Sequence, residues 1–321
     1  MTNRFPESSS ATVFFAWRHR FSLITAASTF VLIFIGGLVT STGSSLAVPD
    51  WPLSYGQFFP PMVGGILYEH GHRMAAGAVA VLTAALAVWT WREEPRRSVR
   101  VLAASALLAI LLQAMLGGVT VLLRLPTAVS VSHAALAQAF FCLTVALALV
   151  TGREWATPNR VEAFDLWLAR LAAATTALVY LQLLVGAVMR HTGAGLAIPD
   201  FPLAYGRIVP DVNSFPVAVH FAHRVGALTV SLLVLVTAGR ALATHRFESG
   251  YTRPALAMLV LVFFQLSLGA SIIWTRKAVL PTTAHVAIGA ALLATSLVLA
   301  LRSHRARRPA DVWLAQSLEL R

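Results

Sequence analysis

The sequence predicts an all-α integral membrane protein, with eight transmembrane helices arranged as two tandem four-helix bundles related by a pseudo-twofold axis. The first observation is composition: 57% of the 321 residues are hydrophobic and 12% are charged, whereas a soluble domain has about 25% charged residues. The second is a set of eight long apolar runs, and the third is a repeat of motifs between the two halves. Because lipid offers the backbone no hydrogen-bond partner, the spans must be helices or a closed barrel.

Each apolar run is long enough for a helix that crosses a bilayer, which takes roughly 20 residues. The runs are too long and too uniformly apolar for the strands of a barrel. The predicted spans lie near residues 22–43, 70–91, 101–123, 129–150, 167–189, 217–239, 254–275 and 281–301.

The two halves of the chain repeat the same motifs in the same order. Residues 36–56 read GGLVTSTGSSLAVPDWPLSYG, and residues 186–206 read GAVMRHTGAGLAIPDFPLAYG, at an offset of 150. Further matches at offsets of 151 and 152 pair Glu69-x-x-His72-Arg73 with His220-x-x-His223-Arg224, and Gln113 and His133 with Gln265 and His285. Four helices return each half to its starting side, so the repeat is parallel and not an inverted transporter repeat.

This repeat divides the chain into five segments, with a boundary in a polar stretch. The predicted segments are a cytoplasmic N-terminal segment (1–21), an N-terminal bundle (22–150), a cytoplasmic linker (151–166), a C-terminal bundle (167–301) and a cytoplasmic tail (302–321).

Arginine and lysine are distributed unevenly about the predicted spans. With the N-terminus in the cytoplasm, the inner segments carry 18 of these residues and the outer segments carry five, while Arg73 and Arg224 lie at outer helix ends. This is the positive-inside pattern, so both termini are predicted to be cytoplasmic. The net charge of +12 therefore reports orientation in a membrane and does not indicate a nucleic-acid partner.

The cysteine content and the N-terminal residues indicate which kinds of site and which cellular membrane to expect. The single cysteine, Cys142, lies in an apolar span, so neither a disulfide within the chain nor a cysteine metal site is expected. Residues 1–20 lack the charged-then-apolar form of a cleaved signal peptide, and Glu7 argues against an organelle transit peptide. We expect a multi-pass protein of a bacterial plasma membrane.

Four histidines occupy matched positions near the outer ends of the even-numbered spans. They are His72, His133, His223 and His285. Ionisable side chains inside membrane helices are costly and usually functional. The second and fourth helices of a bundle can face each other, which places His72 opposite His133, and His223 opposite His285, at one depth toward the outer side. A histidine bonded only to a backbone carbonyl is the simpler explanation for any one of them, but not for four in a duplicated frame.

Two imidazoles that face each other across a four-helix bundle suit axial ligation of a haem iron. Small residues beside the histidines leave room for a flat macrocycle: Gly71, Ala75, Ala76, Gly77, Ala134, Ala135, Ala222, Gly226, Gly289 and Ala290. Arg73 and Arg224 each follow a histidine and can pair with haem propionates. A non-haem metal site needs carboxylates, and the pairs lack them except for Glu69.

Glu69 is the informative difference between the halves, because His220 takes its place in the second. A carboxylate beside one haem can accept a proton or stabilise developing positive charge. The alternative is a helix N-terminal glutamate that favours the dipole. For His70 and His191 we expect solvated, interfacial side chains.

Other repeated residues predict structural tasks. Asp50 and Asp200 are expected to cap a turn in each outer loop, with Trp51 and Phe201 at the lipid interface. Glutamine and glycine recur at a spacing of four, which predicts helix packing first and a cofactor contact second. The pairs are Gln113/Gly117, Gln182/Gly186 and Gln265/Gly269.

Taken together, these motifs resemble the haem A synthase (CtaA/Cox15) family. The resemblance covers residues 22–301 and is carried by TGSSLAVPDWPLSYG, Glu69-x-x-His72-Arg73, His133, TGAGLAIPDFPL, His223-Arg224 and His285.

This resemblance implies an oxidoreductase that converts a ring methyl of haem O into a formyl group by successive hydroxylations, with water as the oxygen source. It implies a substrate haem between His72 and His133, a resident haem b between His223 and His285, and Glu69 at the reacting edge. The haem A made would serve cytochrome oxidase. Haem O synthase is the expected donor of substrate, an unidentified acceptor takes the electrons, and the oligomeric state, including a homo-oligomer, stays open.

One departure and two alternatives remain. Many bacterial members have two cysteines in the first outer loop, and residues 44–69 have none, which excludes a thiol–disulfide step there. A dihaem b-type electron-transfer cytochrome also explains four histidines, but not Glu69. A haem-binding assembly protein that leaves haem unchanged is the second alternative.

Overall fold

Within the residues that the structure describes, every regular element is a helix. The structure is a computed structural model, and it describes residues 8–156 and 164–305. Eight of its helices are long and apolar enough to cross a membrane. The predicted all-α, eight-span membrane fold is therefore confirmed.

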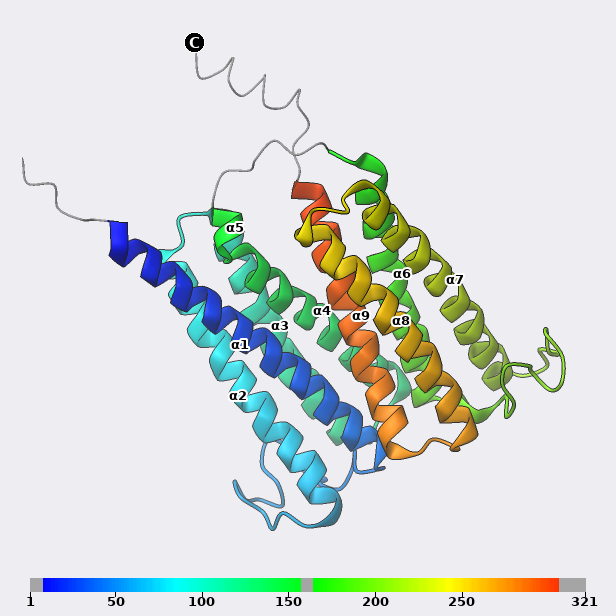
Figure 1. Cartoon of the computed structure of the whole chain (residues 1–321). Coiled ribbons are helices and arrows are strands. Elements are labelled where there is room, and N and C mark those ends of the chain that lie inside the picture. Colours follow the sequence, from blue (N-terminus) through cyan, green and yellow to red (C-terminus); the bar gives the residue numbers. More distant parts are fainter. Residues whose placement is uncertain (1–7, 157–163, 306–321) are drawn as a thin grey trace, which may run out of the picture.

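The eight long helices fall into two groups of four along the chain (Figure 1). The first group is α1 (Ser8–Ser41), α2 (Gly64–Glu93), α3 (Arg97–Leu122) and α4 (Thr127–Val150). The second group is α6 (Leu166–His191), α7 (Phe215–Thr244), α8 (Ser249–Trp274) and α9 (Val279–Arg305).

Helices extend beyond the predicted apolar runs, and two short elements were not predicted. The helix α2 starts at Gly64, six residues before the apolar run at 70–91, because interfacial residues continue the helix past the apolar band. The short helix α5 (Arg153–Ala156) and the 3₁₀ turn η1 (Ala194–Leu196) follow α4 and α6.

Contacts define which helices are neighbours and which face each other across a diagonal. In the first group, α1 packs on α2, α2 on α3, α3 on α4, and α4 on α1. In the second group, α6 packs on α7, α7 on α8, α8 on α9, and α9 on α6. Thus α2 faces α4, and α7 faces α9, across the interior of a four-helix bundle. These are the helices that carry the four histidines.

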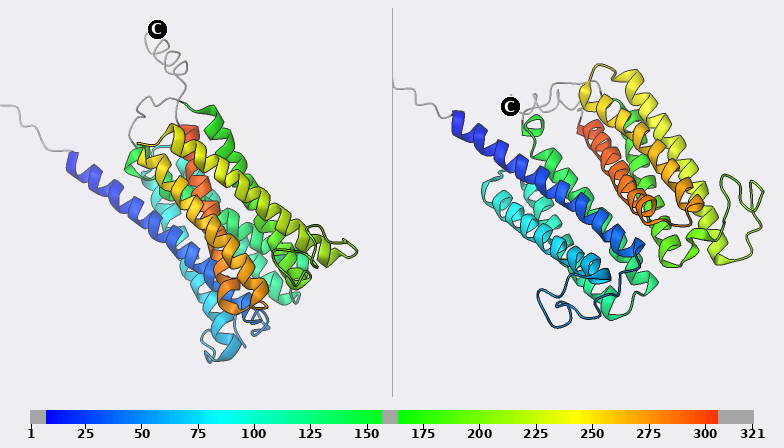
Figure 2. Two further views of the ribbon diagram at one scale, coloured as in Figure 1. Left: turned by 45° about the vertical axis from the view of Figure 1, so that its right-hand side comes forward. Right: turned by 60° about the horizontal axis from the view of Figure 1, so that its bottom comes forward.

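The two bundles join along one side (Figure 2). Helix α1 contacts α9, α4 contacts α6, and α4 contacts α9. The repeat matches α1 with α6 and α4 with α9. A two-fold relation would therefore convert the α1–α9 contact into the α6–α4 contact and leave the α4–α9 contact unchanged. The pseudo-twofold axis and the five-segment division themselves stay predictions. Residues 1–7, 157–163 and 306–321, with Arg4, Arg160, Arg307, Arg308 and Arg321, lie outside the described residues.

Each bundle has one end with long loops, 42–63 and 192–214, which we call the loop end. The start of α1 and the end of α9 both lie at the opposite end (Figure 1). Both observations agree with an even number of spans.

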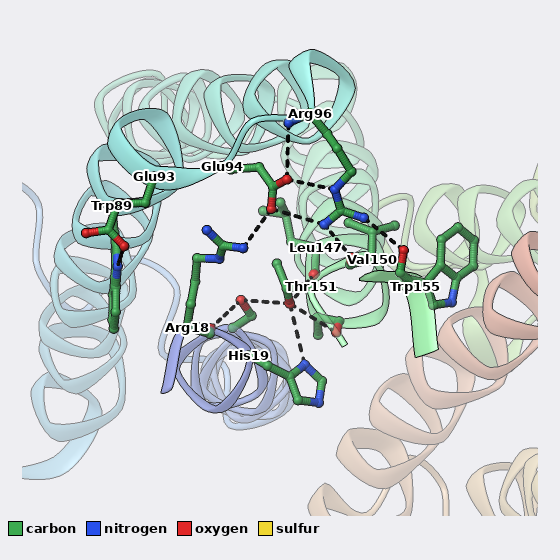
Figure 3. Close-up of polar contacts among 12 residues, drawn as sticks. Arg18, His19, Trp89, Glu93, Glu94, Arg96, Leu147, Val150, Thr151 and Trp155 are labelled. Atoms are coloured by element: carbon green, nitrogen blue, oxygen red, sulfur yellow. Dashed lines mark hydrogen bonds and ion pairs between the residues drawn. The ribbon is translucent and has the colours of Figure 1, made fainter. Parts of the chain in front are cut away.

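A buried ion cluster lies at the opposite end of the first bundle (Figure 3). Arg18 of α1 donates to the Glu94 carboxylate at 2.7 Å, and both residues are 3% exposed. Arg96 also binds that carboxylate, and it donates to the carbonyls of Val150 and Trp155 at 3.0 and 3.1 Å. The cluster therefore ties α1 and the α2–α3 turn to the end of α4.

Glu94 is ionised in this setting. Burial by itself raises the pKa of Glu94, but the hydrogen bonds and positive charge of Arg96, together with Arg18, outweigh it and lower the pKa below its ordinary value. A carboxyl with a lowered pKa stabilises the fold above its unfolded-state pKa, and the contribution is lost as pH falls through the folded-state value.

We predict that Glu94→Ala lowers the free energy of unfolding by about 3 to 5 kcal/mol, because it leaves the buried Arg18 and the partly buried Arg96 without their shared anion. Thermal unfolding in detergent, followed by helical circular dichroism, measures the change. Glu93→Ala is the matched control, since Glu93 is exposed and its carboxylate accepts a hydrogen bond from Trp89. Equal midpoints for the two variants at neutral pH would contradict a stabilising cluster. The wild-type midpoint should also approach that of Glu94→Ala as the pH is lowered.

Candidate functional site

The four predicted histidines lie in the loop-end portions of their helices. His72 is in the third turn of α2 and His223 in the third turn of α7, while His133 and His285 lie in the second turns of α4 and α9. All four side chains are partly buried. Helices α2 and α4 form one diagonal, and α7 and α9 the other, so each bundle brings two imidazoles to its interior at a matched depth.

The second pair has the spacing of two ligands around one metal. The ring centroids of His223 and His285 are 6.4 Å apart, and the ring planes are inclined by 63°. A metal–imidazole bond is about 2 Å long, so one ion fits between two ring nitrogens at this separation. His72 and His133 occupy the corresponding helices of the first bundle.

A glycine of the neighbouring helix lies against each imidazole. A Cβ at Gly36, Gly117 or Gly186 would lie 3.1, 3.0 and 3.0 Å from Cε1 of His72, His133 and His223, respectively. A Cβ at Gly269 would lie 3.5 Å from Cε1 of His285. Any larger side chain at the first three positions displaces a ring. The fourfold recurrence shows that the helices are shaped around the imidazoles.

Three of the four imidazoles also lie beside a glutamine amide, four residues before the glycine. Nε2 of Gln182 lies 3.0 Å from Nδ1 of His223 and donates to its carbonyl at 2.7 Å. Nε2 of Gln113 lies 3.3 Å from Nε2 of His133 and donates to its carbonyl at 3.0 Å. Nε2 of Gln265 lies 3.3 Å from Nε2 of His285. The sequence predicts mainly a helix-packing role for these glutamines. Their contact with the histidines is seen only in the tertiary structure.

Several buried polar atoms around the histidines have no partner among the described residues. These are Nδ1 of His72, His133 and His285, and Oε1 of Gln113 and Gln265. An unpaired buried donor or acceptor is costly, and a metal bound to one imidazole nitrogen leaves the other free to donate to such an oxygen. No group of three or more histidine, cysteine or acidic residues in the described chain forms another metal cluster. The donor set, two imidazoles per bundle, therefore fits the ligation of a haem iron.

Each long loop of the loop end is closed by its aspartate, as predicted. The Asp50 carboxylate accepts from the backbone N–H groups of Tyr55 and Gly56 at 2.7 and 2.8 Å. Asp200 accepts from Tyr205 and Gly206 at the same two distances. These hydrogen bonds hold the pKa of each aspartate below its ordinary value, and the hydrogen bond from the glycine has the largest effect. Both tyrosines have positive φ, and each hydroxyl donates to a loop carbonyl.

Arg73 and Arg224 hold these loops onto their helices. Arg73 donates to the carbonyls of Asp50 and Leu53 at 2.7 and 2.9 Å, and to that of Val48 at 3.1 Å. Arg224 makes the equivalent contacts with the carbonyls of Asp200, Leu203 and Ile198. The sequence motif did not reveal this role, and a contact of either arginine with a haem propionate stays a prediction.

Glu69 and His220 occupy equivalent places with one difference. The Glu69 carboxylate accepts from the backbone N–H of Val48 at 2.7 Å and from Arg73 at 2.6 Å, and the side chain is 4% to 5% exposed. His220 accepts from the N–H of Ile198 at 3.1 Å and is 3% exposed. The loop contact is therefore common to both halves, whereas the negative charge is confined to the first.

The expectations for the remaining residues have mixed outcomes. His70 is buried and bonds to Ser54 at 2.8 Å, so the predicted solvated position is wrong. It is buried because the loop folds back over the start of α2. Trp51 lies over Gly118, and Phe201 packs edge-on against Trp274, with 40% and 38% of their surfaces exposed. His191 is partly buried at the end of α6.

Fold and site define a class: an eight-span helical membrane protein whose two bundles each present a pair of imidazoles at the loop end. Comparison with known families then identifies the family. Residues 63–297 match the model of the COX15-CtaA family, described as cytochrome oxidase assembly protein, and the chain belongs to this family.

Curated relatives are similar over most of their length. A protein named Heme A synthase from Alkalihalophilus pseudofirmus is 30% identical over 276 residues, which cover 84% of this chain and 91% of the relative. The Heme A synthase of Shouchella clausii is 29% identical over 299 residues, 90% and 98% of the two chains. That of Symbiobacterium thermophilum is 30% identical over 227 residues, 67% and 72% of the two chains.

We predict that Arg73→Lys loosens the loop 42–63, because an ammonium cannot reproduce the forked contacts with three carbonyls. Hydrogen exchange at Val48, Tyr55 and Gly56 should accelerate roughly tenfold or more, since hydrogen bonds to charged groups contribute about 1.5 to 3 kcal/mol. Arg207→Lys in the second loop is the control, because Arg207 makes an exposed pair with Asp211. Unchanged protection in Arg73→Lys would show that the loop closes without the arginine.

Proposed function

We propose that this protein is a haem A synthase, which oxidises a ring methyl of haem O to a formyl group. The observation that carries the proposal is a pair of histidines on facing helices of each bundle, with the buried carboxylate of Glu69 three residues before a histidine in the first bundle and His220 at the equivalent place in the second. Membership of the family and the printed names of the relatives support the substrate class.

The two bundles divide the work in this proposal. His72 and His133 hold the substrate haem in the first bundle, and His223 and His285 hold a resident haem b in the second. The assignment follows Glu69, because a site that only transfers electrons needs no carboxylate beside its iron. Bound haem b supplies one-electron transfer toward an acceptor that the chain does not itself contain.

The reaction proceeds by successive hydroxylations of one methyl group, with water as the oxygen source, and a final loss of water leaves the aldehyde. Each hydroxylation replaces one C–H bond with C–O and releases electrons and protons. A haem b held by His223 and His285 would supply the one-electron chemistry that carries these electrons to an external acceptor. The chain's own contribution is to bind and orient the ring, to keep bulk water out and to receive protons.

Glu69 is the proposed catalytic residue. The contacts with Val48 and Arg73 hold its carboxylate in one orientation. Each carboxylate oxygen has capacity for a second hydrogen bond, so these contacts leave Glu69 able to accept a proton from the reacting edge or to stabilise positive charge that develops there.

The proposal also includes the membrane in which the protein lies and its orientation there. The protein lies in a bacterial plasma membrane with both termini in the cytoplasm, so the loop end and its histidines face the outer leaflet. Haem O reaches the first bundle from the enzyme that makes it, and the product is passed on for assembly of cytochrome oxidase.

Haem content tests the proposal directly. We expect protein purified from cells that make haem O to contain haem B together with haem O, haem A or a hydroxylated intermediate, identified by chromatography and mass after extraction. Haem B alone would favour a dihaem electron-transfer cytochrome. Haem O bound but never changed during incubation with an electron acceptor would favour a haem-binding assembly protein.

Charge at position 69 tests the catalytic role. Glu69→Gln keeps an amide oxygen for the Val48 N–H but removes the negative charge, so we expect both haems to be retained and haem A formation to fall by at least roughly a hundredfold, the lower range for loss of a positioned proton-transfer group.

His220→Gln is the matched control in the second bundle, where the loop contact is the same and no charge is lost. We expect it to form haem A at the wild-type rate. Normal haem A formation by Glu69→Gln would remove Glu69 from the chemistry, and the residue would then be a loop anchor only.

A further inference from the structure

The four imidazoles are not held equally, and the difference falls on His72. Glutamine amides lie beside His133, His223 and His285. Among the described residues nothing hydrogen-bonds to the ring of His72, and its buried Nδ1 has no partner. The first bundle therefore has one supported imidazole and one unsupported imidazole, whereas both imidazoles of the second bundle are supported.

The sequence repeat shows what replaces the missing glutamine. Gly36 and Gly186 correspond at an offset of 150, and each lies against an imidazole. Four residues before Gly186 stands Gln182, and four residues before Gly36 stands Leu32. Leu32 is 9% exposed and packs in the apolar core of the first bundle, with Ala75 against the same core.

The two bundles also differ at the residue that packs against this position. In the second bundle a Cβ at Gly226 would overlap the amide oxygen of Gln182, so the glutamine depends on that glycine. The residue that corresponds to Gly226 at an offset of 151 is Ala75. The first bundle thus lacks both the amide and the space that accommodates it.

A hydrogen-bonded partner beside a metal-binding histidine fixes the ring orientation and strengthens the ligand, and its removal typically weakens metal binding by about 10- to 100-fold. The ring of His72 has no such hydrogen bond among the described residues, so its orientation is less constrained than that of the other three imidazoles. We propose that His72 is the ligand that dissociates from the iron of the substrate haem. Haem then enters and leaves the first bundle as His72 binds and releases the iron, while His133 stays in place. Leu32 is then a positioning residue for exchange, and Gln113, Gln182 and Gln265 are positioning residues for retention.

This inference rests on the proposed function, because it takes the first bundle to be the substrate site. It explains how two bundles of the same architecture can differ in how firmly they hold a haem. A resident haem must stay through many turnovers, whereas a substrate must be released once oxidised.

The test follows the loss of each haem to excess apomyoglobin, and the haems that remain on the protein are identified by mass at successive times. In the wild type we expect haem O or haem A to leave faster than haem B. Gln182→Leu should speed the loss of haem B roughly tenfold or more, the low end for a supporting partner. Gln138→Leu is the matched control, since Gln138 is a buried glutamine with no bond to a histidine, and we expect no change there.

The reciprocal variant is Leu32→Gln combined with Ala75→Gly, which reproduces the Gln182 and Gly226 arrangement. It should slow the loss of haem O and haem A roughly tenfold. If it does not fold, Gln182→Leu decides the question. Equal loss rates for both wild-type haems, together with no effect of Gln182→Leu, would overturn this inference and leave the proposed function standing. Protein that holds haem B but no haem O, haem A or intermediate would overturn the proposed function, and this inference with it.

Discussion

A polar side chain inside a membrane span must find its partner within the protein, because lipid provides none. At the loop end, Arg73 and Arg224 bind loop carbonyls that have no partner in a helix or sheet. At the opposite end, Arg18 and Arg96 share the Glu94 carboxylate (Figure 3). In the interior, glutamine amides lie beside three of the imidazoles. Nδ1 of His72, His133 and His285 is buried and has no partner among the described residues, and these three nitrogens lie where a haem iron is expected.

The duplicated frame makes the few differences between the halves informative. The loops, the arginine anchors and the glycines beside the imidazoles recur in both bundles. The frame is broken at Glu69, where the second half has His220, and at Leu32, where it has Gln182. Glu69 lies three residues before His72 on α2, and Leu32 lies four residues before Gly36, the glycine against the His72 ring. In the proposed function, these two differences separate a site for a reacting haem from a site for a resident one, while the rest of the architecture is kept.

Some features of the site could not be read from the sequence. His70 looked like a solvated residue at a helix end, but the loop that returns over α2 buries it against Ser54. The motif predicts a propionate contact for Arg73, and the structure adds that its guanidinium binds carbonyls of the Val48–Leu53 segment. Both depend on the path of an irregular loop, which hydrophobic periodicity does not specify. The glutamine–glycine spacing was visible, but whether the amide meets lipid, another helix or an imidazole depends on helix rotation.

The sequence by itself determined the eight spans, the division into two halves and the four histidines, because apolar length and repeated motifs are properties of the chain alone. It also singled out Glu69 as the difference between the halves. Only the tertiary structure decided which helices are neighbours and which are diagonal, and hence that Gln182 reaches His223 while Leu32 leaves His72 unsupported. The physical reason is that a polar contact between helices depends on distances of about 3 Å, and these are set by helix rotation and close packing at glycine rather than by spacing along the chain.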